Sequence, residues 1–236
     1  MQITLHFAGR IALPLSHKYY IQSMLYAMLC VDPAYADFLH NEGFPSAQKP
    51  FKLYTFSDLH GVYRIADKQI FFENGFSLTV HAWDTRYVKT MVQFAAHHRD
   101  LTLCGQPITL IKYTVQDKHI TTEDITVKTR SPITVYTTQN GKTVYFSPDT
   151  PAFFEALTDN AYRKWQSVHT DLCPPLRIDP LGTYKKAVTV YKDTYVTAFH
   201  GAYRLQGAAP VLDFLYQTGL GSKNAQGFGL FEMIKT

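Results

Sequence analysis

The chain has 236 residues, of which 46% are hydrophobic, 14% aromatic and 18% charged. This composition excludes a disordered chain, because it supplies enough apolar side chains for one large domain or two smaller ones. The formal net charge is +4, from 23 Lys and Arg against 19 Asp and Glu. The charge therefore permits a nucleic-acid partner without demanding one.

The cysteine and targeting patterns favour a cytoplasmic protein. Cys30, Cys104 and Cys173 are far apart in the sequence and have no spacing typical of a zinc site or a disulfide framework, so we expect neither. No basic segment followed by a long apolar run opens the chain, and no stretch approaches about 20 apolar residues. We therefore expect no signal peptide and no contact with a membrane.

The first half of the chain predicts strands and helices in the order βαββαβ. The expected elements are a strand over 2–13, a helix from the N-cap Ser16 to about Asp32, a short helix over 34–40, strands over 51–57, 61–66 and 69–80, a helix over 84–98, and strands over 101–105 and 108–115. This order is typical of a ferredoxin-like fold. The polar stretch over 117–124 then predicts a boundary between two domains, 1–118 and 119–236.

The second half predicts the same order again, with an extra hairpin. Its expected elements are strands over 125–137 and 142–147, a helix from Pro151 to about Val168, a Pro-rich link over 173–180, strands over 184–192 and 194–204, a helix over 208–216, and a strand over 228–234. The predicted fold class is therefore α+β, with two tandem ferredoxin-like (RRM-like) domains and a glycine-rich loop near the end of the second.

The segment 219–229 is unusual in its glycine content. It reads GLGSKNAQGFG, with glycines at 219, 221, 227 and 229 and a lysine at 223. Glycines and a lysine are able to cradle a phosphate, but they also suit a turn packed tightly between a helix and a strand. The segment fits neither a Walker A loop nor a dinucleotide fingerprint, and it runs from helix to strand instead of strand to helix.

The glycine pattern does resemble the C-terminal loop of the CRISPR-associated repeat-RNA endoribonucleases of the repeat-associated mysterious protein (RAMP) superfamily. Two further segments are similar to that family: KTRSPITV at 128–135 and YYIQSMLY at 19–26. The resemblance spans essentially the whole chain and implies two ferredoxin-like domains. It also implies a nuclease that needs no metal or other cofactor and cuts CRISPR repeat RNA (pre-crRNA) by attack of the 2′-hydroxyl on the adjacent phosphate. The products would carry 5′-hydroxyl and 2′,3′-cyclic phosphate ends.

The same resemblance implies three catalytic residues, all in the first half. His40 occupies the place of the family's catalytic histidine, and histidine is suited to proton transfer near neutral pH. Tyr26 matches the active-site tyrosine and would orient the 2′-hydroxyl or relay its proton. Lys52 would stabilise the negative charge of the phosphorane, although Lys49 is an alternative for that role. The resemblance leaves open whether His40 or Tyr26 is the base.

RNA binding is expected from basic residues and from the glycine-rich loop. The expected contacts are Lys18, Lys128, Arg130, Gly219, Gly221, Lys223, Gly227 and Gly229. A Gly221→Val substitution should then block the RNA sterically without unfolding the domain. The aromatic residues of the segment 200–204 could stack on bases, although at least one side of that strand is expected to be core.

Two other functions stay open at this point. A member of the same superfamily could hold RNA within a CRISPR effector complex without cutting it, and a homodimer is equally compatible with the sequence. A ferredoxin-like metabolic enzyme would instead bind a small phosphorylated ligand in an enclosed pocket. The set of Tyr26, His40 and Lys52 favours the nuclease over both.

Overall fold

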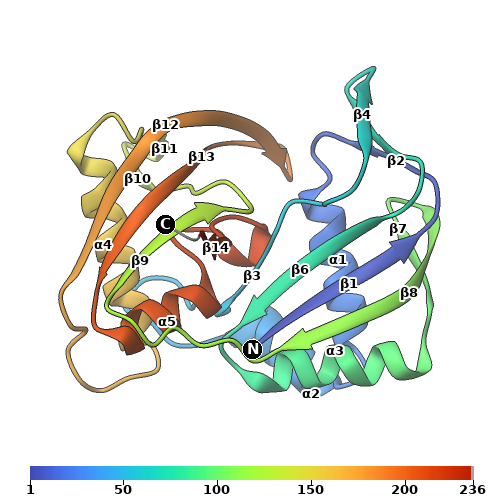
Figure 1. Cartoon of the computed structure of the whole chain (residues 1–236), viewed down its shortest axis with the longest axis horizontal. Helices are drawn as coiled ribbons and strands as arrows, with labels where there is room; N and C mark the ends of the chain where they lie inside the picture. The colour runs from blue at the N-terminus through green and yellow to red at the C-terminus, as the bar shows by residue number, and fades with distance from the viewer. Residues whose placement is uncertain (235–236) are drawn as a thin grey trace.

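A computed structural model describes residues 1–234 as a mixed α/β protein with several antiparallel sheets. Its N-terminal and C-terminal halves lie side by side (Figure 1). Within the described residues, no helix is both long and apolar enough to cross a membrane.

The N-terminal half is built on a five-stranded sheet of order β3-β6-β1-β8-β7, in which neighbours are antiparallel. Its strands are β1 (Gln2–Ala8), β3 (Tyr54–Phe56), β6 (Phe76–Ala82), β7 (Asp100–Leu103) and β8 (Gln106–Gln116). The helices of this half are α1 (Lys18–Leu29), α2 (Pro33–Asp37), the π-helical turn η1 (Phe38–Glu42) and α3 (Thr85–His97). A smaller sheet of order β2-β5-β4 holds β2 (Ile11–Pro14), β4 (Tyr63–Ala66) and β5 (Gln69–Phe72).

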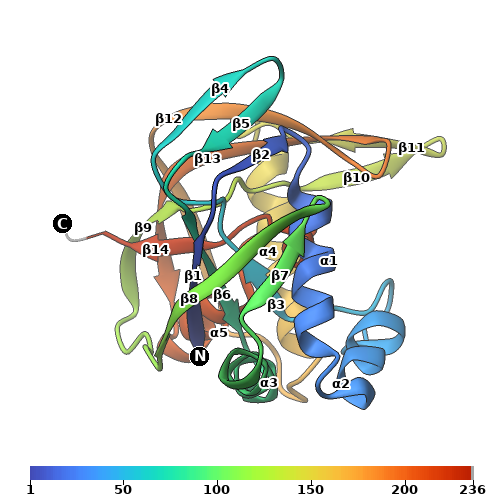
Figure 2. The ribbon, with the colours of Figure 1, turned by 90° about the vertical axis from the view of Figure 1, so that its right-hand side faces the viewer.

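The C-terminal half is built on a four-stranded sheet of order β12-β13-β9-β14. Its strands are β9 (Asp124–Thr129), β12 (Leu176–Tyr191), β13 (Thr194–Gly207) and β14 (Phe231–Met233), and its helices are α4 (Pro151–Gln166), α5 (Ala209–Thr218) and the short 3₁₀ turn η2 (Asn224–Gln226). A separate hairpin of β10 (Tyr136–Gln139) and β11 (Lys142–Tyr145) projects from the body of the molecule (Figure 2).

The two main sheets share one arrangement of their strands. The order β3-β6-β1-β8 in the first sheet corresponds to β12-β13-β9-β14 in the second. In both, the strand that comes first in the chain lies between the third and the fourth, and β7 is an additional edge strand of the first sheet. Each half buries its own apolar cluster, which includes Leu5 and Met28 in the first half and Val127 and Leu157 in the second. The predicted repetition of one order of elements is thus matched by a repeated sheet order.

The helix α1 shows how the sequence pattern becomes packing. Its buried apolar face is the predicted one, with apolar residues three and four positions apart: Ile21, Met24, Leu25, Met28 and Leu29. The helix begins two residues after the predicted N-cap, because the chain makes a turn at 15–17 and His17 takes the cap position.

Several predicted strand boundaries are wrong, each for a local reason. The strand expected over 2–13 breaks at Gly9, where φ is +127°, and its second part joins a different sheet. The strand expected over 69–80 is divided by a turn at Gly75, where φ is +85°. The segment 173–180 is not wholly a link, since β12 begins at Leu176 and includes Pro180. Proline is tolerated there because β12 is an edge strand.

Polar contacts join the two halves at several points. The buried His81 of β6 lies with Nδ1 2.8 Å from the carbonyl oxygen of Tyr216 on α5. Burial lowers the pKa of His81 to about 4, so this imidazole is neutral at neutral pH. On β3, the Thr55 hydroxyl donates to the carbonyl oxygen of Phe228 across a distance of 2.9 Å. The glycine-rich segment therefore lies in the contact between the halves.

Candidate active site

The segment that carries His40 is a tight helical turn held by a buried anchor. The short helix α2 starts at Asp32, whose carboxylate accepts from the backbone N–H of Tyr35, and the chain continues directly into η1. Within η1, Leu39 is fully buried and His40 is exposed. Gly43 ends the turn with φ of +72°. The buried leucine fixes the turn, and the adjacent imidazole is presented to solvent.

Tyr26 and His40 lie in direct contact. Their ring centroids are 5.6 Å apart and the ring planes are nearly perpendicular, at 80°. The Tyr26 hydroxyl donates to the carbonyl oxygen of Leu39 at 3.2 Å. Burial raises the pKa of Tyr26, so its phenol is neutral and serves as a hydrogen-bonding group at neutral pH.

Lys52 follows the loop 45–50 and contacts the turn that carries His40. Its Nζ donates to the carbonyl oxygen of His40 at 3.0 Å. Phe44 and Phe51 form an isolated antiparallel bridge with two backbone hydrogen bonds, so residues 45–50 loop out beyond it and Lys52 returns to η1. A Cβ at Gly43 would lie 2.6 Å from the Phe51 carbonyl oxygen and 3.2 Å from Lys52 Nζ, which explains the glycine.

The electrostatics around Lys52 are mixed. Partial burial lowers the pKa of Lys52, and the carboxylate of Glu42 partly opposes this shift. Lys49, the alternative to Lys52, belongs to a different group: it lies close enough to Lys223 to add to the lowering, mainly by burial, of the Lys223 pKa. The hydrogen bond of Lys52 to the His40 carbonyl oxygen therefore favours Lys52 over Lys49 as the lysine of this cluster.

Two residues that the sequence analysis did not single out hold the His40 ring. Nδ1 of His40 lies 2.8 Å from Oδ1 of Asn41, and the amide nitrogen of Asn41 donates to Asp37 at 2.5 Å. Because a carbonyl oxygen only accepts, Nδ1 is the donor in this contact, which leaves Nε2 as the nitrogen that can take a proton. The signal was available in the sequence: Asp37 and Asn41 are four residues apart, a spacing that puts them on one side of a helical turn.

The cluster thus combines an imidazole with one free nitrogen, a neutral phenol and an ammonium group. An imidazole moves a proton, a phenol orients a hydroxyl, and an ammonium group stabilises a developing negative charge. These are the three tasks of a phosphodiester cleavage by an internal hydroxyl. Within residues 1–234, no group of three or more His, Cys, Asp and Glu side chains is placed to hold a metal ion.

Lys18 is not the exposed phosphate contact that we expected. Its side chain is buried, with Nζ 2.5 Å from the Asp58 carboxylate and 2.7 Å from the carbonyl oxygen of Gly227. Partial burial would raise the pKa of Asp58, but Lys18 and His200 outweigh it and hold that pKa well below its usual value. Lys18 is therefore an internal cation that joins α1 to the glycine-rich segment.

The four glycines of 219–229 are also not free to approach a ligand. All four are buried and have φ between +70° and +85°. A Cβ would lie 2.3 Å from the Phe56 ring at Gly227 and 1.9 Å from the Leu220 carbonyl oxygen at Gly229. At Gly221 it would lie 2.7 Å from the Thr134 carbonyl oxygen. The space that each glycine leaves is filled by the protein itself, so Gly221→Val would disturb the fold and the earlier expectation is wrong.

Backbone groups and a second buried lysine complete this closed segment. The N–H groups of Gly219, Leu220, Ser222, Gln226, Gly227 and Gly229 all donate to carbonyl oxygens of the chain. Lys164 of α4, only 1% exposed, donates to the carbonyl oxygen of Gly219 and to Oδ1 of Asn224. Burial lowers the pKa of Lys164 to about 7. The four glycines and these backbone groups are therefore engaged within the protein.

The remaining predicted RNA contacts are on the surface and apart from the cluster. Lys128 is exposed on β9, and Arg130, just after that strand, lies 3.5 Å from the Glu232 carboxylate. Lys223 projects from the packed turn with Nζ 5.1 Å from the centre of the Tyr136 ring. Among the aromatic residues of 200–204, Tyr203 is fully buried, as expected for one side of a strand. Lys49, in the loop 45–50, lies close enough to Lys223 to affect its pKa, and these two lysines form a basic patch.

A family model described as "CRISPR associated protein Cas6, C-terminal" matches residues 115–233, half of the chain. The chain belongs to the Cas6 family. It is 25% identical over 226 residues to a CRISPR-associated endoribonuclease Cas6 of Methanocaldococcus jannaschii, covering 92% of this chain and 86% of that protein. It is 24% identical over 225 residues to the Cas6 endoribonuclease of Pyrococcus furiosus, covering 93% and 83%.

Solved structures of the Cas6 and RAMP type share the fold. The product of a Cas6-related gene from Pyrococcus furiosus matches with a TM-score of 0.87 at 20% identity, over 100% of this chain and 98% of that one. A RAMP protein described as binding different RNA substrates matches with a TM-score of 0.84 at 18% identity, over all of both chains. The resemblance inferred from three short segments is thus confirmed over the whole chain.

Proposed function

We propose that this protein is a metal-independent endoribonuclease that cleaves CRISPR repeat RNA. The observation that carries the proposal is that Tyr26 and Lys52, from separate segments, both contact the turn of His40: the Tyr26 ring lies against the exposed imidazole, and the Lys52 ammonium binds the His40 carbonyl oxygen. The names of its curated relatives, both Cas6 endoribonucleases, support the same reaction class. We also propose that the two halves are ferredoxin-like domains divided near residue 118.

In the proposed reaction, the 2′-oxygen of one nucleotide attacks the adjacent phosphorus and the bond from phosphorus to the 5′-oxygen breaks. His40 is suited to take the 2′-proton, because its Nε2 lone pair is free while Nδ1–H is held by Asn41. The His40 imidazolium returns this proton to the departing 5′-oxygen, and the products carry a 2′,3′-cyclic phosphate and a 5′-hydroxyl. The neutral Tyr26 phenol, beside the imidazole, would orient the attacking hydroxyl.

Lys52 would supply the positive charge that the crowded phosphorane needs. Its ammonium is held 3.0 Å from the His40 carbonyl oxygen and is half-buried, so it is positioned before substrate binds. The patch of Lys49 and Lys223 would bind an RNA phosphate further along the strand. Two like charges that lie close together repel, and an anion between them relieves that repulsion.

The test uses the full chain and labelled RNA that carries the host's CRISPR repeat. We expect one discrete cut that excess EDTA leaves unchanged, and a 3′ end that accepts no further nucleotides until its phosphate is removed. A matched RNA with a single 2′-deoxy nucleotide before the cut should bind equally well and stay intact. Binding without any product would contradict the proposal and favour a non-catalytic member of an effector complex. Loss of activity in EDTA would indicate another class of nuclease.

A further inference from the structure

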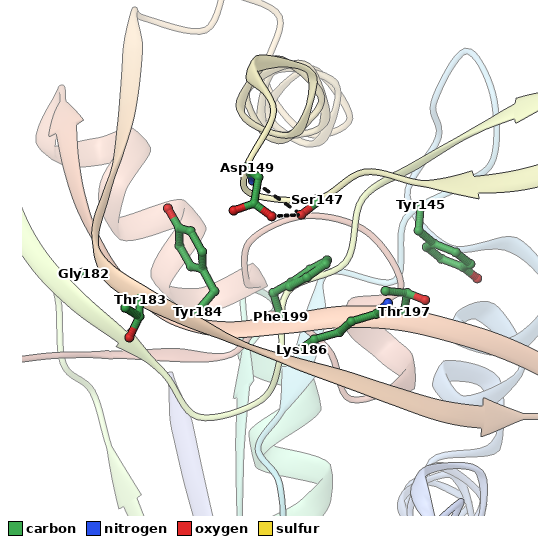
Figure 3. A pocket seen from close by; sticks show the side chains of 9 residues that line it. All are labelled: Tyr145, Ser147, Asp149, Gly182, Thr183, Tyr184, Lys186, Thr197 and Phe199. Carbon is green, nitrogen blue, oxygen red and sulfur yellow. Dashed lines mark hydrogen bonds between the residues drawn. The ribbon is translucent and has the colours of Figure 1, made fainter.

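A second site lies in the C-terminal half, where β12 and β13 lose their regular pairing. Leu181 pairs with Ala202 and Lys185 pairs with His200, so residues 182–184 of β12 face the single residue Gly201 of β13. The resulting bulge lies opposite the end of β11 and the turn that leads into α4 (Figure 3). An open pocket of ≈ 780 Å³ lies between them. Bulges of this kind re-aim side chains next to functional sites.

The bulge turns an aromatic ring into this pocket and supports it from behind. A Cβ at Gly201 would lie 2.9 Å from the Tyr184 ring and 3.3 Å from the hydroxyl of Tyr203, so the glycine lets the Tyr184 ring lie close to the strand. The rings of Tyr184 and Tyr203 are stacked, with centroids 6.1 Å apart and planes 27° apart. Phe199, almost fully buried, forms the adjacent floor. Tyr184 lines the pocket and is only partly buried, so part of its ring is accessible to a flat ligand.

The polar groups around the ring are of two kinds. The Ser147 hydroxyl donates to Oδ2 of Asp149 at 2.7 Å and fixes the carboxylate, which lies on the same side of the pocket as the Tyr184 hydroxyl (Figure 3). Lys186, exposed on β12, adds a positive charge at another part of the lining. The carboxylate would repel a phosphate and accept from N–H donors, whereas the ammonium would attract a phosphate.

These features match the parts of one nucleotide. An aromatic face stacks a base, a carboxylate accepts from the base edge, and a lysine binds the phosphate. Guanine presents two N–H donors on one edge, which suits a carboxylate better than the single donor that each of the other bases offers there. We propose that this pocket binds one unpaired nucleotide of the RNA substrate, with guanine preferred. The inference rests on the proposed function in taking RNA as the ligand.

The test measures binding of labelled pentanucleotides, UUGUU, UUAUU, UUCUU and UUUUU, to the full chain by fluorescence anisotropy. We expect UUGUU to bind best. Tyr184→Ala should weaken its binding about 5- to 150-fold, the usual effect of losing one base stack. Tyr184→Phe should bind like the wild type, because the ring is kept. Asp149→Asn should lower the affinity for UUGUU to that for UUAUU and leave the affinities for the other RNAs unchanged.

Controls separate this site from the nuclease proposal. Tyr63→Ala removes an exposed tyrosine from β4 in the other half and should change nothing. Equal binding of all four RNAs, unaffected by Tyr184→Ala, would overturn the pocket while repeat cleavage by the wild type persists. Guanosine monophosphate that binds as tightly as UUGUU would overturn the assignment to RNA. Guanine binding that depends on Tyr184 and Asp149 would support the pocket even if repeat RNA stayed uncut.

Discussion

Two segments that the sequence marked as candidate RNA-contacting regions, 38–52 and 219–229, differ in their exposure in the structure. Residues 38–52 hold polar groups at the surface: His40 is exposed and Lys52 is half-exposed. Residues 219–229 bury their four glycines, and six of their backbone N–H groups donate to carbonyl oxygens of the chain. The first segment presents polar side chains to solvent. The glycines and carbonyl oxygens of the second segment instead contact Phe56, Lys18 and Lys164. Substitutions should therefore affect activity in the first segment and stability in the second.

The largest effect on this comparison is expected from His40→Ala. The variant loses the proton carrier, so cleavage of repeat RNA under single-turnover conditions should fall about 10²- to 10⁴-fold. RNA affinity and the urea midpoint should stay close to those of the wild type, because the imidazole is exposed. His60→Ala, at another exposed histidine, is the matched control. Undiminished cleavage by His40→Ala would remove this residue from the mechanism.

Lys52→Ala tests the charge within the same open segment. Losing a group that stabilises the phosphorane should slow cleavage about 10²-fold, the low end for such groups because this ammonium is half-exposed. Lys49→Ala is the comparison: it should weaken RNA binding and leave the rate at saturating enzyme nearly unchanged. The measurement is the single-turnover rate across a range of enzyme concentrations. The reverse pattern would exchange the roles of the two lysines.

Gly227→Ala tests the closed segment. The new methyl group would lie 2.3 Å from a carbon of the buried Phe56 ring, at a residue with φ of +85°. Overpacking and backbone strain together should lower the free energy of unfolding by about 2–4 kcal/mol, measured with urea. Gly105→Ala has a similar φ, +74°, but meets open space, so it should show the strain alone. An equal loss of unfolding free energy in both variants would mean that the Phe56 ring moves aside without cost.

Lys164 gives the closed segment a pH dependence. Its pKa is about 7 in the folded protein and near the ordinary 10.5 in the unfolded chain. Between these values the unfolded chain binds more protons, so stability should rise with pH, by about 2 kcal/mol from about pH 7.5 to about pH 9. Lys164→Met should lack this rise. The free energy of unfolding of both proteins is measured with urea at both pH values, and the difference between them isolates the contribution of Lys164. An equal rise in the two proteins would contradict the prediction.

Tyr26→Phe should have the smallest effect. It removes one hydroxyl that donates to the Leu39 carbonyl oxygen but keeps the ring against His40. The phenol would no longer orient the attacking 2′-hydroxyl, and the loss of one hydrogen bond of about 1 kcal/mol from the transition state corresponds to about a 5-fold slower cleavage. Single-turnover rates of the two proteins measure this difference. A loss as large as that of His40→Ala would instead make the phenol a proton carrier.

The sequence predicted most of the helices and strands and the group of Tyr26, His40 and Lys52. It did not predict that two lysines, Lys18 and Lys164, would be buried against the segment 219–229. Lys18 lies three and seven residues before the buried Ile21 and Leu25, and Lys164 lies seven and three residues after Leu157 and Ala161. Each lysine therefore occupies an apolar stripe, a position that favours a buried amino group over one at the surface.

The glycines could not be interpreted from sequence for a different reason. A missing Cβ leaves room equally for a phosphate oxygen or for a ring of the same protein. Only the three-dimensional neighbours decide, and at Gly227 the neighbour is Phe56, 171 positions earlier in the chain. The pocket at Tyr184 escaped notice similarly, because the bulge depends on the register between β12 and β13.

The contact of Thr55 and Phe56 with Phe228 and Gly227 has a consequence for assembly. β3 pairs with β6 within its own half, but its contact with Phe228, and that of Lys18 in the first turn of α1 with Gly227, need residues 173 and 209 positions further along the chain. A ribosome-bound chain that lacks residues 219–229 would expose the Phe56 ring and leave the Lys18 ammonium without the Gly227 carbonyl. The N-terminal half therefore completes these contacts only when residues 219–229 are present.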